Sequence, residues 1–124
     1  MKTVLVLAPF IFLAACGDAN QNTSSNTANR TEASGQAIYE MKCGICHKES
    51  GASTGPALKG VIARWNGDTS RIQAFIRDPS KMIAAADPQA NAVYEKYKPV
   101  VMNGFPDLSP QQLQEILQYI QAIP

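Results

Sequence analysis

Residues 43–47 read Cys43-Gly44-Ile45-Cys46-His47, and this stretch determines how the rest of the chain is interpreted. Two cysteines three residues apart, with a histidine directly after the second, are typical of covalent attachment of a c-type haem. The two thiols can reach the two vinyl groups of one porphyrin, and the histidine then lies beneath the iron. The sequence therefore predicts one covalent haem c, attached through Cys43 and Cys46, with His47 as the proximal iron ligand.

Three other uses of these cysteines agree less well with the sequence. A tetrahedral zinc site needs about four ligands, but His47 is the only histidine, and the third cysteine lies far away in the N-terminal segment. A thioredoxin-like redox pair expects a strand-helix-strand setting, which the helical pattern described below lacks. A disulfide between such close cysteines closes too small a loop to stabilise the chain much. These alternatives stay open, and haem attachment is preferred.

Residues 1–15 are typical of a signal peptide. Lys2 precedes an apolar run from Val4 to Leu13, which is too short to span a bilayer comfortably, and small residues follow it. The sequence Leu13-Ala14-Ala15-Cys16 resembles the lipobox of bacterial lipoproteins, in which the cysteine is lipidated and becomes the mature N-terminus. The resemblance implies a protein anchored by lipid on Cys16 at the periplasmic or extracytoplasmic side of a bacterial membrane. An ordinary signal peptide is the alternative.

Residues 16–34 combine Cys16 with a segment that contains no large apolar side chain. Such a segment cannot bury enough surface to compensate for the entropy lost on ordering. We expect a flexible linker here, followed by a single folded domain over residues 35–124.

The composition sets limits on both partners and stability. Eleven basic residues face ten acidic ones, and no basic run exceeds two residues, so a nucleic-acid partner is not expected. Aromatic residues make up only 7% of the chain. A small domain of this composition would be marginally stable without a buried cofactor.

The folded part is expected to consist of short helices joined by loops, with no strand-like alternation. The expected elements are a helix from Ser34, as its cap, to about Lys42, a long loop over 48–60, a helix over 70–77 that ends before Pro79, and a short helix that starts at Asp87 and Pro88.

The last helix has the clearest boundaries. Ser109 is a good N-cap, Pro110 suits the first helical position, and Gln112 completes a capping box. The apolar residues recur at helical spacing: Leu113, Ile116, Leu117 and Ile120. The fold class predicted from the sequence is therefore all-α.

Together these residues resemble the class I monohaem cytochromes c, helical electron carriers of the periplasm and related compartments. The resemblance covers about residues 34–123 and rests on the attachment motif, the pair Gly35 and Tyr39, the loop 55–60 (Gly-Pro-Ala-Leu-Lys-Gly) and the run 102–109 before the last helix. It implies a cytochrome c fold of four to five short helices around one haem. It also implies that the first and last helices cross, with Gly35 and Tyr39 against Ile116 and Tyr119.

The same resemblance implies roles for three further residues. The Pro56 carbonyl would accept a hydrogen bond from the His47 ring, which fixes the imidazole and makes it a better ligand. Leu58 would pack on the haem face. Trp65, with Arg64, would direct donors toward a haem propionate; a packed indole beside a solvated arginine is the equally weighted alternative.

The number of candidates for the sixth iron ligand can be reduced by elimination. With one histidine, a two-histidine haem within this chain is excluded, which leaves methionine, lysine, water or no ligand. Met41 lies too close to Cys43 to reach the opposite haem face, so Met82 and Met102 remain. The resemblance favours Met102, which precedes the last helix where the family places its methionine ligand, although Asn103 follows it where proline is frequent.

Histidine and methionine ligation implies an electron carrier and not an enzyme, because a filled sixth position blocks small molecules from the iron. We expect a monomer that exchanges electrons with redox protein partners of a respiratory chain, or with a dehydrogenase and an oxidase. A haem-based sensor in which Met102 is displaced by a small ligand is the alternative. A peroxidase is disfavoured because the chain has no second histidine and no second attachment motif.

Overall fold

The computed structural model describes residue 31 and residues 34–124. The predicted signal peptide, Cys16 and nearly all of the predicted linker lie outside the described residues. Ser34, which was expected to cap the first helix, is itself helical, as is Thr31. The prediction of Ser34 as a helix cap is therefore wrong.

The first helix changes its winding shortly before the attachment motif. Residues 34–38 are α-helical and continue into a π-helix, η1 (Tyr39–Cys43), whose wider turn is closed by the Gly44 N–H donating to the Tyr39 carbonyl oxygen at 2.8 Å. One α-type turn follows, because the His47 N–H donates to the Cys43 carbonyl oxygen at 2.8 Å.

The rest of the described chain is helical with loops and contains no strand, as the predicted all-α class requires. The further helices are α2 (Val61–Arg64), α3 (Thr69–Arg77), α4 (Pro79–Ala84), α5 (Pro88–Tyr97) and α6 (Pro110–Ala122). Counting η1, the described residues form six helices, where four to five were predicted. The two short helices α2 and α4 were not anticipated.

Aspartates begin three successive helices. Asp68 accepts a hydrogen bond from the backbone of α3, Asp78 from that of α4, and Asp87 from the Gln89 and Ala90 N–H groups of α5. Pro79 ends α3, as predicted, but it also occupies the first turn of α4, where its missing N–H costs nothing. The chain can therefore turn sharply between α3, α4 and α5.

Helix α6 begins as predicted. The Gln112 N–H donates to Ser109 Oγ at 3.1 Å, and the Ser109 N–H donates to Gln112 Oε1 at 2.9 Å, which completes the capping box. Its apolar stripe is buried: Leu113, Ile116, Leu117 and Ile120.

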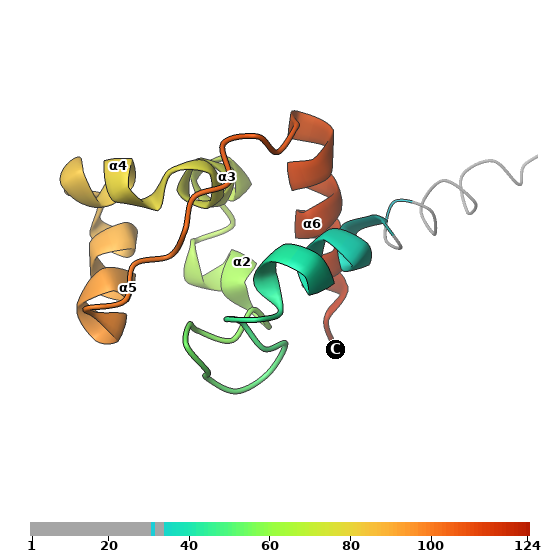
Figure 1. Cartoon of the computed structure of the whole chain (residues 1–124), viewed down its shortest axis with the longest axis horizontal. Helices are drawn as coiled ribbons and strands as arrows, with labels where there is room; N and C mark the ends of the chain where they lie inside the picture. The colour runs from blue at the N-terminus through green and yellow to red at the C-terminus, as the bar shows by residue number, and fades with distance from the viewer. Residues whose placement is uncertain (1–30, 32–33) are drawn as a thin grey trace, which may run out of the picture.

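The first helix and α6 cross at close contact, which confirms the predicted crossing (Figure 1). A Cβ atom on Gly35 would lie 2.1 Å from the Glu115 carbonyl oxygen, so only glycine permits this approach. The Tyr39 and Tyr119 rings pack with their centroids 5.2 Å apart. These two helices form one end of the domain.

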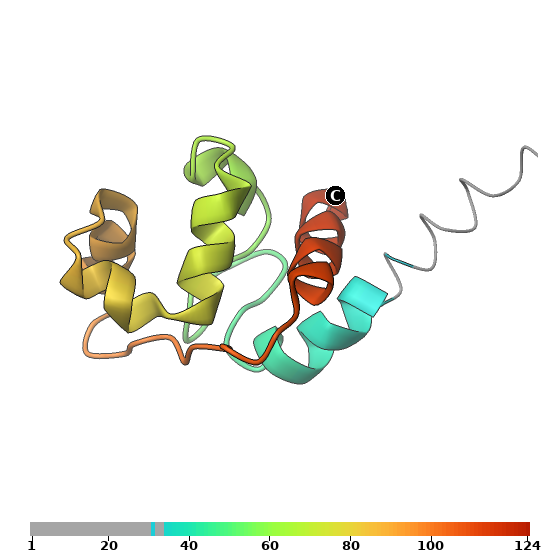
Figure 2. The ribbon, with the colours of Figure 1, turned by 90° about the horizontal axis from the view of Figure 1, so that it is seen from above.

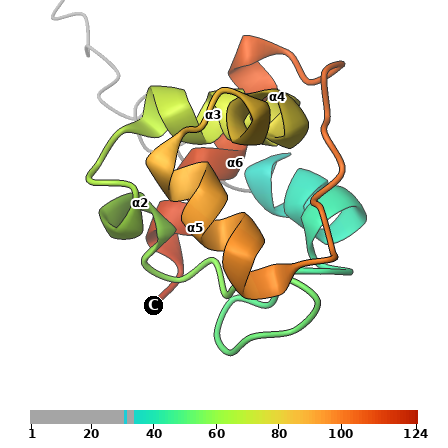
Figure 3. The same cartoon turned by 90° about the vertical axis from the view of Figure 1, so that its left-hand side faces the viewer.

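Helices α4 and α5 form the opposite end, with α3 between the two ends (Figures 1 and 2). Figure 3 looks from the α4–α5 end toward α6. The segment from residue 98 to 109 returns from α5 to α6 and passes the end of α3, where the Phe105 N–H donates to the Ile76 carbonyl oxygen at 2.9 Å. None of the helices in the described part of the chain is long and apolar enough to cross a membrane.

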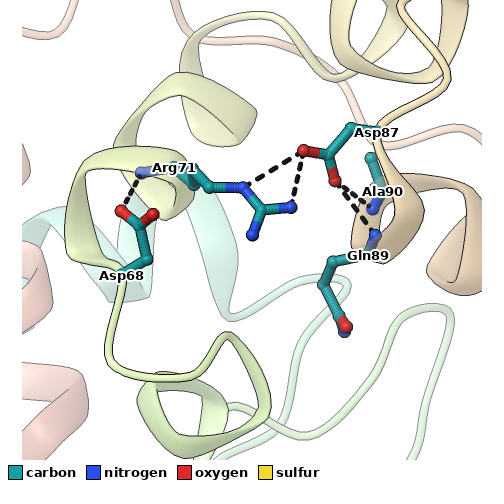
Figure 4. A network of polar contacts seen from close by, with 5 residues as sticks. All are labelled: Asp68, Arg71, Asp87, Gln89 and Ala90. Atoms are coloured by element: carbon teal, nitrogen blue, oxygen red, sulfur yellow. Dashed lines mark hydrogen bonds and ion pairs between the residues drawn. The ribbon is translucent and has the colours of Figure 1, made fainter.

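An ion pair connects α3 to the start of α5 (Figure 4). Asp87 Oδ2 accepts hydrogen bonds from Arg71 Nη2 at 2.6 Å and Nε at 3.1 Å, while Oδ1 caps α5. The Ala90 N–H foremost, together with the Arg71 guanidinium, holds the pKa of the Asp87 carboxyl below its usual range. The Asp87 carboxylate thus links helix α3 to the start of helix α5.

Two substitutions separate the two roles of Asp87. Asp87→Ala removes cap and ion pair and should lower the free energy of unfolding by about 1–2 kcal/mol. Asp87→Asn keeps a good cap and should cost less, about 0.5–1 kcal/mol. Because the carboxyl pKa is lowered in the folded state, its stabilisation is present above the ordinary value of about 4 and is lost as pH falls through the lowered value.

The measurement is urea denaturation of the three proteins from pH 7 down to acid. The stability difference between the native protein and Asp87→Asn should disappear toward acid pH. A difference that persists unchanged through the acid range would contradict a role for the ionised carboxylate.

Candidate haem site

A cavity of about 290 Å³ lies at the centre of the domain, and each of η1 and α2–α6 contributes to its wall. Most of the lining side chains are apolar. They include Leu58, Val61, Trp65, Ile72, Phe75, Ile76, Ile83, Val93, Val100, Val101, Met102, Phe105, Ile116 and Ile120. A wall of this kind suits a large apolar ligand with few polar groups.

The attachment motif forms one side of the cavity. Cys43, Cys46 and His47 all line it, because positions i, i+3 and i+4 of a helical turn share one face. The two cysteines are not joined in a disulfide. Cys46 is exposed, whereas burial, partly offset by Lys42, raises the pKa of the Cys43 thiol to about 11 before haem is attached.

The His47 ring is held from two sides. Its Nδ1 lies 2.8 Å from the Pro56 carbonyl oxygen, so Nδ1 is the nitrogen that carries the proton and Nε2 is left for a metal. Gly55 packs directly against the ring, since a Cβ atom at this position would lie 2.5 Å from His47 Cε1. The Gly55 N–H also donates to the Cys46 carbonyl oxygen at 2.9 Å, which ties the loop to the motif.

Two tyrosines form hydrogen bonds to residues 47–49, at the end of the attachment motif. The sequence did not indicate these contacts. The Tyr39 hydroxyl donates to the His47 carbonyl oxygen at 2.8 Å, and the Tyr119 hydroxyl donates to Glu49 Oε1 at 2.5 Å. Burial raises the pKa of Tyr39, and the hydrogen bond to Glu49 raises the pKa of Tyr119 to about 12. Both phenols therefore keep their protons, and act as donors, at neutral pH.

The methionines differ in their relation to the cavity. Met102 lines it, as His47 does, whereas Met82 packs against buried apolar residues of the core and is not part of the cavity wall. Met41 is 67% exposed. The structure thus brings Met102, and neither of the other two, into the same cavity as His47.

Leu58 and Trp65 also line the cavity, but Arg64 does not. Trp65 is 4% exposed, packs on Phe75 and has the Arg71 guanidinium 5.6 Å from its ring centre. The exposed Arg64 donates to the Lys59 carbonyl oxygen at 2.6 Å and to the Ala57 carbonyl oxygen. Arg64 therefore supports the loop that carries Pro56.

The comparisons with known proteins agree with this site. A family model for cytochrome c matches residues 32–124. The chain belongs to the cytochrome c family. Cytochromes c bind haem covalently through a cysteine pair, and Cys43 and Cys46 stand at the spacing this requires. No curated protein and no solved structure matches the chain.

The residues present suit the family's cofactor. The two thiols lie on one wall of an apolar cavity, and the one histidine beside them has Nε2 free of the Pro56 contact. Within the described residues, no group of three histidine, cysteine, aspartate or glutamate side chains is arranged to hold a metal ion. The cofactor of this cytochrome c is a covalent c-type haem with iron.

Gly55 offers a direct test of how His47 is held. Gly55→Ala would place a methyl group 2.5 Å from His47 Cε1, so the ring must leave its position beside Pro56. We expect a loss of about 1–3 kcal/mol in stability and an altered haem absorption spectrum. Gly44→Ala is the matched control, because Gly44 has a helical φ of −62° and a Cβ atom there meets nothing closer than 3.5 Å.

The test compares thermal denaturation and the visible spectrum of both variants. Gly44→Ala should keep the native spectrum. A native spectrum and native stability in Gly55→Ala would show that the ring is not confined as described.

Proposed function

We propose that this cytochrome c is a single-electron carrier whose haem iron is held by His47 and Met102. The observation that carries the proposal is that Met102 lines the same apolar cavity as His47, while His47 Nδ1 is already engaged by Pro56. A haem bound by histidine and methionine supplies a one-electron ferric/ferrous couple of raised potential.

The chain's own residues would keep the site suited to electron transfer. Pro56 would fix the orientation of the His47 ring, and Met102 would take the ligand position that a small molecule could otherwise occupy. The apolar wall would limit the access of water to the iron. Since few polar groups line the cavity, little rearrangement accompanies a change of charge.

The surface at the cavity opening would receive redox partners. Val100 and Val101 line the cavity and remain 47% and 42% exposed, and Cys46 is exposed on the motif side. The cation of Lys42 lies 5.6 Å from the Phe105 ring centre, also at the cavity. Small transient interfaces are typical of electron-transfer complexes, and this opening offers apolar contact with a cation beside it.

The protein would act at a bacterial membrane surface, held by lipid on Cys16 and facing the periplasmic or extracytoplasmic side. The support is the apolar run before Leu13-Ala14-Ala15-Cys16. A tethered carrier could pass electrons between respiratory complexes, or from a dehydrogenase to an oxidase.

Met102→Ala and Met82→Ala test the ligand assignment. Met102→Ala should abolish the weak far-red absorption of a thioether-ligated ferric haem and lower the reduction potential, because the soft ligand that favours ferrous iron is lost. Met82→Ala should keep both properties and lose only packing, about 2 kcal/mol. The readouts are the ferric absorption spectrum and a spectroelectrochemical titration.

The assignment is overturned if Met82→Ala, and not Met102→Ala, changes the spectrum. If neither does, the sixth ligand is not a methionine, and a binding or sensing role becomes the better account.

Cys16→Ser tests the anchor. The variant should move from the membrane fraction to the soluble fraction on cell fractionation, with the haem spectrum unchanged because the change lies outside the folded domain. Retention of Cys16→Ser in the membrane fraction would refute lipid anchoring at this residue.

A further inference from the structure

We propose that Tyr39 is a positioning residue for His47, whose hydroxyl keeps the imidazole hydrogen-bonded to Pro56 and so holds the reduction potential of the haem down. The inference rests on the proposed ligation of iron by His47. It concerns a contact that nothing in the attachment motif requires, since a phenylalanine could occupy the helix crossing equally well.

The first step is the fixed place of the Tyr39 hydroxyl. Tyr39 is only 6% exposed and belongs to η1, and its ring packs on Tyr119 of α6 at 5.2 Å and an interplanar angle of 45°. Because the Tyr39 ring is confined between two helices, it cannot move along with the His47 backbone. The hydroxyl therefore acts as a fixed donor 2.8 Å from the His47 carbonyl oxygen.

The second step is the coupling of that carbonyl to the ring. The imidazole of His47 is attached to the backbone through the Cα atom, so the two move together. The ring has no room to change its position against the loop, because Gly55 packs directly on it. A shift of the His47 backbone must therefore change the 2.8 Å contact between Nδ1 and the Pro56 carbonyl oxygen. The Tyr39 hydroxyl and the Pro56 carbonyl hold the two sides of the same residue.

The third step is electronic. An Nδ1–H group that donates to a carbonyl oxygen makes the imidazole a more basic ligand. A more basic ligand stabilises ferric over ferrous iron and lowers the reduction potential. Loss of the Tyr39 hydroxyl should weaken this donation, so the potential should rise and the Nδ1 proton should exchange faster with solvent.

Tyr119 provides the matched control. Its hydroxyl also bonds to the segment after the motif, but to the side chain of Glu49 and not to His47. Tyr119→Phe and Tyr39→Phe each remove one phenol oxygen from the same aromatic pair. Only Tyr39→Phe removes a contact to His47.

The experiment uses the holo-proteins of the native sequence, Tyr39→Phe and Tyr119→Phe. The reduction potential is measured by spectroelectrochemical titration, and exchange of the His47 Nδ1 proton in deuterated buffer is followed by NMR. Tyr39→Phe should raise the reduction potential. It should also make the Nδ1 proton exchange about five times faster, which is the factor that one neutral hydrogen bond contributes. Tyr119→Phe should keep the native potential and exchange rate, although it too loses stability to denaturant.

An unchanged potential in Tyr39→Phe, or an equal rise in both variants, would overturn the proposal. Failure of the proposed function gives a different result, because the native protein itself would then lack the spectrum of a histidine- and methionine-ligated haem. If that spectrum is present and Tyr39→Phe matches the native potential, only the positioning role is refuted.

Discussion

The structure depends on one constraint: the apolar residues that line the central cavity must be covered by the cofactor. Each of η1 and α2–α6 gives at least one side chain to that wall, including Ile83 from the short α4 and Tyr94 from α5. A domain with so few aromatic residues gains much of its buried apolar area only when the cavity is filled by the cofactor. The haem is thus part of the core as well as the functional group.

Within this arrangement His47 is held by contacts on several sides. Its ring is bonded to Pro56, its carbonyl oxygen to Tyr39, and one ring face is covered by Gly55. These contacts come from the first helix and from the loop after the motif, and the helix is in turn fixed by α6 at the Gly35 crossing. The orientation of the His47 ring therefore depends on residues at both ends of the folded chain.

Much of this could be predicted where a local chemical rule applies. The capping box at Ser109, the start of α5 at Asp87 and the motif itself each have a short-range physical cause. Helices α2 and α4 could not be predicted, because four and six residues are too few to show a helical period. The contacts of Tyr39 and Arg64 with backbone carbonyls also left no trace in the sequence, since they depend on how distant segments meet.

The most direct test of a closed electron-transfer site is the absorption spectrum of the purified, reduced holo-protein before and after carbon monoxide is added. If His47 and Met102 occupy both axial positions, the spectrum should not change, because no position on the iron is open. Rapid binding of carbon monoxide would contradict this account and would show an open or easily displaced sixth ligand.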